Sequence, residues 1–278
     1  MTMKSVRWHT LALIGLLTGL SSAIFGIGGS AVLIPALLLI CRYEQKQATV
    51  TTLAVSLPSV VVGLITYGIL QSSAGFLNFF NLAFALISSA VIGTFLGSHL
   101  LKKFHNPTLT MLFTMVLMTV GLRMIGAINI SIHPYHDTAL GLVLIIAGFL
   151  AGTGNALLGI GGGAILVPTL YLFAGLTEHQ AVIMSLVVIG PTTVISLFHH
   201  RKSTLIHRGH IRILIPAALF GAVMGAFIGN RLSGAVLSEG FGLFLIIFAV
   251  YTFIYTLFTG FFKNKQRQGE VSDIANVL

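Results

Sequence analysis

Long uncharged stretches, separated by short polar connections, make up most of the chain. The first covers residues 10–41, and its 32 residues would form a continuous helix of about 48 Å, whereas the hydrocarbon core of a bilayer is about 30 Å thick. It is interrupted by Gly26-Ile27-Gly28-Gly29-Ser30. Because each glycine costs about 1 kcal/mol relative to alanine inside a helix, we predict two shorter helices, at about 10–25 and 31–41, with a break between them.

The other uncharged stretches are assigned in the same way. In the first half we expect helices at about 48–69, 79–101 and 108–128, followed by a polar connection at 133–137. The second half starts with another interrupted element at 138–174 and continues with helices at about 180–199, 211–232 and 240–262. The pattern predicts an all-α polytopic membrane protein with about eight apolar segments in a single transmembrane domain, residues 1–262. Residues 263–278 are polar without apolar periodicity and are expected to form a disordered cytoplasmic tail.

The interrupted element occurs twice. Gly15–Pro35 aligns without a gap with Gly148–Pro168 at an offset of 133 residues, and 11 of the 21 aligned positions are identical. The same offset continues beyond this segment and gives 18 identities in 44 positions. Such self-similarity indicates internal duplication. We therefore predict two homologous repeats, at about 9–128 and 138–262.

Small residues recur at helical spacing within both repeats. Gly93–Gly97 matches Gly225–Gly229 at an offset of 132, and both segments have a GxxxG pattern. A similar stripe, Gly15/Gly19/Ala23, leads into the first break, and its counterpart leads into the second. Because such residues let helix backbones approach closely in lipid, we expect both stripes to serve helix packing.

Composition and charge placement favour a membrane protein with inverted repeats. Hydrophobic residues make up 56% of the chain and charged residues 8%, against about a quarter charged in soluble domains. Lys and Arg lie at the ends of the uncharged stretches, where they act as topology signals, so we expect no nucleic-acid partner despite the net charge of +9. If each broken element entered the membrane and returned to its starting side, or crossed it twice with short helices, 13 basic residues would lie inside and only Arg123 and Arg231 outside. Repeats of parallel orientation would instead place ten inside and five outside, so the positive-inside rule favours inverted repeats with both termini cytoplasmic.

The two glycine breaks are the candidate substrate site. Non-helical backbone at membrane depth occurs where it is buried in protein or lines a watery cavity. Each break opens the amino end of a half-helix, which presents unpaired N–H groups and about half a positive charge to an anion. The candidate substrate-binding residues are Gly26, Gly28, Gly29, Ser30, Gln47, Asn155, Gly159, Gly161, Gly162, Gly163, Gln180 and Thr192, with helix breaks or kinks at Pro35, Pro58, Pro168 and Pro191. Two alternatives stay open: the glycines could serve only close helix crossing, and Gln47 and Gln180 could serve helix-start hydrogen bonding.

Catalytic and metal chemistry finds no support in the sequence. No Asp or Glu lies inside a predicted span, which argues against a carboxylate proton relay, a sodium cage or a cation substrate. The histidines of the 199–210 segment accompany basic residues but no Cys or acid that would complete a metal site. We therefore expect no catalytic residues, no metal and no cofactor. An intramembrane enzyme, a non-transporting scaffold and an anion channel remain as alternatives to a transporter.

The sequence resembles the sulfite exporter TauE/SafE family, also called the sulfonate uptake permease family. The resemblance rests on two G-x-G-G-[SG]-x-x-x-x-P segments, Gly26–Pro35 and Gly159–Pro168, each followed by a Gln-Ala pair at Gln47 and Gln180. It extends over about residues 9–262. It implies a bacterial inner-membrane transporter that moves sulfite, sulfonates or related sulfur-containing organic anions. The expected mechanism is alternating access around the two broken helices, with a small anion and the lipid bilayer as partners and a homo-oligomer allowed.

Overall fold

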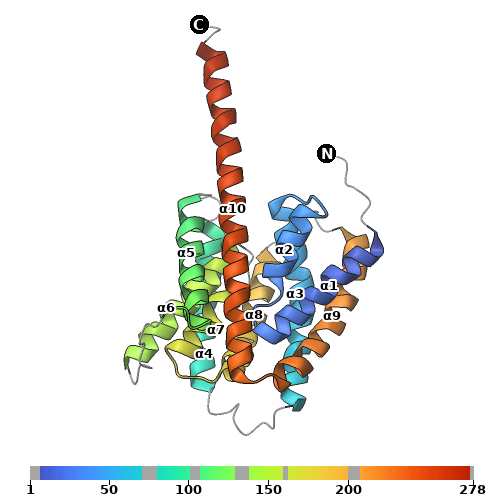
Figure 1. Ribbon diagram of the computed structural model, residues 1–278, viewed down its shortest axis with the longest axis vertical. Coiled ribbons are helices and arrows are strands. Elements are labelled where there is room, and N and C mark those ends of the chain that lie inside the picture. Colours follow the sequence, from blue (N-terminus) through green and yellow to red (C-terminus); the bar gives the residue numbers. More distant parts are fainter. Residues whose placement is uncertain are drawn as a thin grey trace. The chain divides into compact units, whose positions relative to one another are not determined.

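The protein is helical throughout the part of the chain that its structure describes. The structure is a computed structural model that describes residues 7–70, 80–100, 107–128, 138–158, 162–199 and 207–275 (Figure 1). The described helices are α1 (Trp8–Phe25), α2 (Ser30–Leu39), α3 (Gln45–Leu70), α4 (Phe80–Leu100), α5 (Pro107–Met124), α6 (Thr138–Leu158), α7 (Gly163–Leu172), α8 (Glu178–His199), α9 (Arg208–Arg231) and α10 (Gly234–Ala275). By length and composition, α1, α3, α8, α9 and α10 could cross a membrane, and each of the other five helices contains a shorter apolar segment.

Both predicted breaks are present. Between α1 and α2, Gly26, Gly28 and Gly29 have φ angles of +65°, +73° and +73°, a region in which a Cβ atom is strained. The second break separates α6 from α7 and includes Gly162, whereas residues 159–161 lie outside the described part.

All four predicted kink prolines lie inside helices. Pro35 and Pro168 occupy corresponding positions in α2 and α7, and Pro58 and Pro191 lie within α3 and α8. Because proline has no N–H group, each of these helices loses one internal hydrogen bond while continuing past the proline.

The chain divides into two compact units. Unit 1 comprises Met1–Lys103 and Ser131–Ser238, and unit 2 comprises Phe104–Ile130 and Glu239–Leu278. Unit 1 therefore holds the first three elements of each predicted repeat, and unit 2 holds α5 and most of α10. Within unit 2 these two helices cross at glycines, because a Cβ atom on Gly121 would lie 2.9 Å from the carbonyl oxygen of Gly242.

Helix α1 packs along α9, and α6 packs along α4. Both pairs run parallel and meet through the small residues that the sequence singled out. A Cβ atom on Gly15 would lie 2.7 Å from the Leu214 carbonyl oxygen, and one on Gly148 would lie 2.8 Å from that of Leu86. The prediction that these stripes serve close packing is confirmed.

The pairing of the GxxxG segments, however, was wrong by one helical turn. The backbone of Gly93 abuts Phe149, and that of Gly221 abuts Leu16. Phe149 and Leu16 are equivalent at the offset of 133, so the structural counterpart of Gly93 is Gly221, not Gly225. Helix α9 has glycine at every fourth position from 221 to 229, so an alignment by glycine alone cannot distinguish neighbouring turns.

The first broken element folds back on itself. At the start of α9, Nδ1 of His210 lies 2.6 Å from the hydroxyl oxygen of Tyr43, in the α2–α3 connection. Leu11 of α1 and Leu37 of α2 pack in the same buried cluster as Tyr43. The end of α2 therefore lies beside the start of α1, as Figure 1 also shows.

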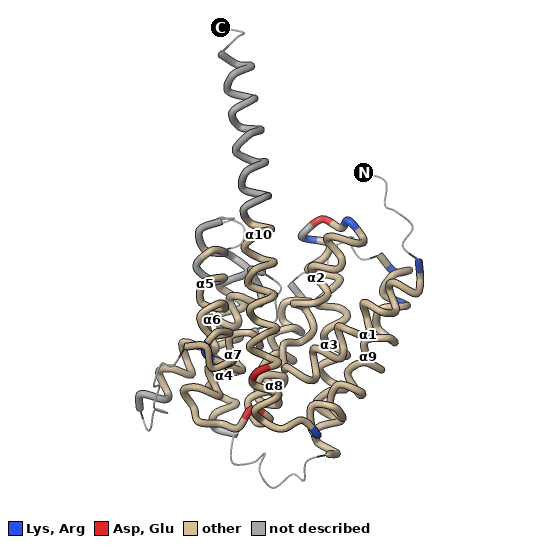
Figure 2. Tube along the Cα trace, in the orientation of Figure 1, with Lys and Arg blue, Asp and Glu red and all other residues tan. Residues whose placement is uncertain are grey.

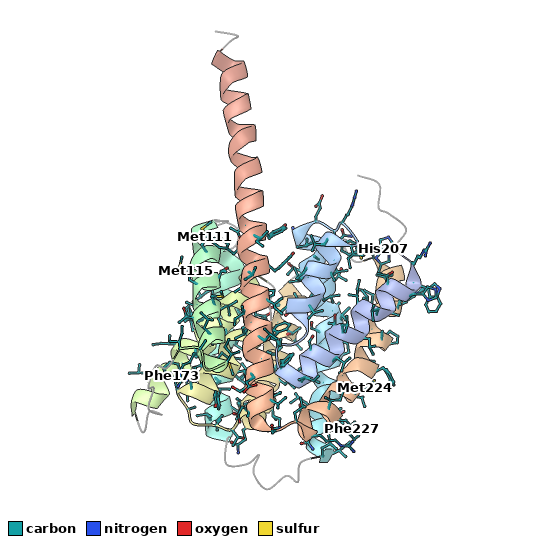
Figure 3. All side chains as sticks on the ribbon, viewed as in Figure 1. Met111, Met115, Phe173, His207, Met224 and Phe227 are labelled. Carbon is teal, nitrogen blue, oxygen red and sulfur yellow. The ribbon has the colours of Figure 1, made fainter. Side chains whose placement is uncertain are left out.

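The second broken element leads to the opposite end of α9. There the Nε2 atom of His179, at the start of α8, lies 3.0 Å from the carbonyl oxygen of Gly229. His210 and Gly229 are separated by a helical rise of about 28 Å. Figure 3 labels His207 and Phe227 near the two ends of this helix. In unit 1, basic residues gather at the end that holds the starts of α1 and α9 and the α2–α3 connection (Figure 2).

Two expectations about the last helix are corrected. Helix α10 begins at Gly234, not at about residue 240, so Glu239 lies within it and is exposed. The helix continues to Ala275, and residues 263–275, expected to be disordered, are helical. This segment contains Lys, Gln, Arg and Glu, which have high helix propensity, and it extends a helix that has already been nucleated by the apolar segment.

Candidate functional site

The two glycine breaks lie against each other in unit 1. Gly163, the first residue of α7, abuts Gly26, and a Cβ atom on Gly163 would lie 2.7 Å from the Cα atom of Ile27. Ile27 and Gly163 are buried. Two candidate glycines, Gly26 and Gly163, are thus brought together from positions far apart in the chain. Gly28, Gly29 and Gly162 instead face Ile189, Thr18 and Ala151, respectively, and Gly159 and Gly161 lie outside the described residues.

Helix α8 holds the first break by a hydrogen bond. The Ser185 hydroxyl donates to the carbonyl oxygen of Gly26 at 2.5 Å. The backbone of Val182, one turn earlier on α8, is so close to Gly26 that a Cβ atom there would lie 2.9 Å from the Val182 carbonyl oxygen. Gly26 therefore needs glycine both for its positive φ angle and for this approach.

The amino ends of α2 and α7 have no side-chain cap. Gly29 and Gly162 precede the two helices, and neither makes a side-chain capping hydrogen bond. Their carbonyl oxygens accept the first helical bonds, from Val32 and Leu33 and from Ile165 and Leu166. The N–H groups of the residues before those donors have no partner within the helix. The breaks therefore combine helix-end N–H groups with backbone that carries no side chain.

Asn155 and Thr192 form a polar pair on α6 and α8. The Asn155 amide nitrogen donates to the Thr192 hydroxyl at 3.4 Å, and both side chains are buried. Thr192 also lies within hydrogen-bonding distance of the carbonyl oxygens of Val188 and Ile189. The equivalent positions in the first repeat are Ser22 and Ser59, and Ser59 donates to its own helix at Val55. The repeats thus place different polar groups at equivalent positions.

Several buried serine and threonine hydroxyls have no hydrogen-bond partner within the described part of the chain. They belong to Ser22, Ser30, Thr51, Thr52, Ser56 and Ser196. Of these, only Ser30 is among the candidate substrate-binding residues predicted from the sequence. A signal was available for Ser56, because Thr52, Ser56 and Ser59 follow one another at spacings of four and three, which places them on one face of α3. That helix packs against α8.

Gln180 takes the helix-start role that the sequence left open. Its side-chain oxygen accepts a hydrogen bond from the Thr177 backbone at 3.0 Å, and its own N–H donates to the Thr177 hydroxyl at 3.4 Å. This reciprocal pair is a capping box at the start of α8. Gln47 lies at the corresponding place in the first turn of α3 and is half-buried. The structure therefore shows the helix-start role for Gln180, and substrate contact by Gln47 and Gln180 stays a prediction.

Among the described residues, no group of three His, Cys, Asp or Glu side chains could hold a metal ion. His207 and His210 stack with ring centroids 4.7 Å apart, and His210 contacts Tyr43. These contacts connect α9 with the α2–α3 connection.

Comparison with known proteins decides the family. The sulfite exporter TauE/SafE family matches the chain in two segments, residues 2–124 and 144–275. The chain belongs to the TauE/SafE family. The two matched segments correspond to the two halves in which the glycine-broken elements occur, so TauE/SafE membership covers both breaks.

Relatives of this TauE/SafE protein are named as transporters. A probable membrane transporter protein of Xylella fastidiosa (strain Temecula1) is 27% identical over 243 residues, which cover 85% of this chain and 91% of the relative. The probable membrane transporter protein YunE of Bacillus subtilis is 23% identical over 247 residues, covering 80% and 88%. MJ0441 of Methanocaldococcus jannaschii, also a probable membrane transporter protein, is 36% identical over 115 residues. TauE/SafE membership and the apolar helices together make this chain a multi-pass protein of a membrane transporter family.

Proposed function

We propose that this protein is a secondary transporter that carries sulfite, sulfonates or related sulfur-containing anions across the bacterial inner membrane. The observation that carries the proposal is the contact between the two glycine breaks, where Gly163 abuts Gly26 and Ile27. Discontinuous helices that meet inside a bundle form the substrate sites of several transporter folds. The family name supplies the substrate class.

Alternating access would arise from two inverted repeats that rock around the breaks. Supporting this, the connection after the first broken element lies at one end of α9, at Tyr43, and the connection after the second lies at the other end, near His179. The packing is reciprocal as well. Helix α1 of the first repeat packs on α9 of the second, and α6 of the second repeat packs on α4 of the first. We assign the Tyr43 end to the cytoplasm because Arg7, Arg42, Lys46, Arg208 and Arg212 accompany it in sequence.

The substrate contacts would come chiefly from backbone. An anion would bind the free N–H groups at the starts of α2 and α7, with the Ser30 hydroxyl as an additional donor. Asn155 and Thr192 would supply polar groups from the second repeat. This chemistry suits an oxyanion, whose several oxygen atoms can each accept a hydrogen bond.

Flux measurements in proteoliposomes test the proposal. Purified protein should move radiolabelled sulfite or a simple sulfonate, and substrate on the opposite side should accelerate exchange, which a channel would not show. Gly28→Leu should lower the flux at least about tenfold, since Gly28 has a φ angle of +73° and a Cβ atom would lie 3.1 Å from Ile189. Gly68→Leu is the matched control because nothing lies within 4 Å of its added Cβ atom.

The possible results separate function from site. No flux of any sulfur anion by folded wild-type protein would refute the transporter proposal. Unchanged flux in a correctly assembled Gly28→Leu variant would refute the site and leave the function standing.

A further inference from the structure

The starts of α1 and α9 lie side by side at one end of unit 1. Leu11 of α1 and Leu214 of α9 belong to one buried cluster, which also contains Tyr43 of the α2–α3 connection. The Tyr43 hydroxyl lies 2.6 Å from Nδ1 of His210, near the start of α9. Three segments from two different repeats therefore meet at this end.

Positive charge is concentrated on the surface of this end (Figure 2). Within the described residues 7–12, 40–48 and 207–214, Glu44 is the one acidic residue. Against it stand five basic side chains, all exposed, which we call the basic patch: Arg7, Arg42, Lys46, Arg208 and Arg212.

The backbone adds charge of the same sign. Neither α1 nor α9 has an acidic residue in its first turn or a side-chain cap. Each helix start carries about half a positive charge, which an acidic side chain would offset. At the start of α9, Arg208 adds to this charge instead. The basic patch therefore attracts an anion from outside the chain.

The side of α9 that carries the patch continues into an apolar surface. Arg208, Arg212, Pro216 and Phe220 follow one another at intervals of four residues and are all exposed, so they lie along one side of the helix. The rise from Arg212 to Phe220 is about 12 Å. A partner that matches this side has an anionic group at one end and an apolar body beyond it.

Helix α1 shows the same transition. Trp8 is its first residue, is 62% exposed and is the single tryptophan of the chain. Exposed Leu13 and Leu17 follow further along the helix. Tryptophan is enriched where a membrane meets water. The patch thus lies at headgroup level, beside surface that is suited to acyl chains.

We propose that the basic patch binds the phosphate groups of anionic phospholipids, whose acyl chains lie along the exposed apolar side chains of α1 and α9. Two repeats contribute to the patch, Arg7 from the first and Arg208 from the second. The proposal depends on placement in a membrane and is independent of the transported substrate. A soluble acidic protein would match the charges but would leave the adjoining apolar surface uncovered.

Trp8 provides a direct test in the wild-type protein, because the tryptophan fluorescence of the chain comes from it alone. The protein is placed in bilayers of equal parts phosphatidylglycerol and phosphatidylcholine with identical acyl chains. In one sample the phosphatidylglycerol carries bromine on chain carbons near the headgroup, and in the other the phosphatidylcholine does. We expect brominated phosphatidylglycerol to quench Trp8 at least about twice as strongly. Equal quenching would overturn the proposal.

Charge variants identify the residues responsible. Arg208→Gln combined with Arg212→Gln should remove at least about half of the excess quenching. Arg231→Gln is the matched control, because Arg231 is exposed at the other end of the same helix. If the first double variant fails to assemble, Arg42→Gln with Lys46→Gln takes its place. Full excess in a folded patch variant, or an equal loss in Arg231→Gln, would refute the assignment to the patch.

Salt and free phosphate test the nature of the contact. Raising sodium chloride to about 0.5 M should reduce the excess quenching, because salt screens exposed charges. An excess that is insensitive to salt would contradict electrostatic binding of the headgroup. Inorganic phosphate should act only as strongly as chloride at the same ionic strength. Selective loss of the excess in phosphate would make the patch a small-anion site and overturn the lipid assignment.

Discussion

The hydroxyl of Ser185 donates a hydrogen bond to the backbone carbonyl of Gly26 at 2.5 Å, although 159 residues separate the two in the chain. The bond joins the second long helix of one repeat to the glycine break of the other. Both residues are buried, so loss of the donor would leave a buried carbonyl without this bond, and such losses cost about 1–3 kcal/mol.

The first prediction concerns removal of the Ser185 hydroxyl. Ser185→Ala should lower the melting temperature in detergent by about 2–4 °C per kcal/mol lost and should slow transport, because the break is no longer held by α8. The measurement is thermal unfolding followed by size-exclusion chromatography, with Ser88→Ala as a hydroxyl control on α4. Identical melting of the two variants would mean that the bond contributes nothing to stability.

Two glycines of α6 offer an internally controlled packing test. A Cβ atom on Gly152 would lie 2.9 Å from the Thr94 nitrogen, whereas one on Gly141 would meet nothing within 4 Å. Gly152→Ala should therefore destabilise the protein by about 1–3 kcal/mol through overpacking against α4. Gly141→Ala should be neutral or slightly stabilising, since alanine favours helix. Equal melting temperatures of Gly152→Ala and Gly141→Ala would show that α4 and α6 pack less closely than in the structure.

Cys41, in the α2–α3 connection, should be unreactive near neutral pH. Burial raises the pKa of its thiol from 9.0 to about 11, so the reactive thiolate is scarce in the folded protein. Thiol labelling should be much slower than at an exposed Lys46→Cys in a Cys41→Ala background. Fast labelling of folded wild-type protein at pH 7 would contradict the burial.

The same group gives a stability prediction at alkaline pH. Because the folded pKa lies above the unfolded value, the contribution of Cys41 is fully present below pH 9 and is lost as pH rises toward about 11. The stability difference between wild type and Cys41→Ala should shrink across this window. A constant difference would indicate an unshifted thiol.

Accessible cysteines test the orientation of the two broken elements. In a Cys41→Ala background, Lys46→Cys and His207→Cys should label from the same side of the membrane, because Tyr43 contacts His210. Ser233→Cys, beyond the other end of α9, should label only from the opposite side. Labelling of all three from one side would refute the inverted arrangement.

The capping role of Gln180 predicts an effect on stability and not on substrate affinity. Gln180→Ala removes half of the capping box with Thr177 and should cost about 1 kcal/mol of stability. The KM for the transported anion should stay unchanged, whereas Ser30→Ala should raise it. A raised KM in folded Gln180→Ala would instead support substrate contact by the glutamine.

Much of the architecture was predictable because it depends on local properties. The lengths of the uncharged stretches determine which segments can be membrane helices. Three closely spaced glycines with positive φ angles end α1. Glycine content is a local property of the chain, so this end could be predicted without the positions of the surrounding helices. The tail was mispredicted because polarity alone does not stop a helix that has already formed and whose residues favour it.

The sequence by itself determined the helical membrane class, the duplication and the position of the first break, since hydropathy and glycine content act over a few turns of chain. Only the tertiary structure decided that α2 folds back to Tyr43, that Gly221 is the counterpart of Gly93, and that Ser185 reaches Gly26. A serine hydroxyl can bond to its own helix, to a neighbouring helix or to nothing, and its partner depends on how distant segments pack. For the same reason, only the structure could show that Gly163 contacts Gly26, because proximity is a property of the packed bundle.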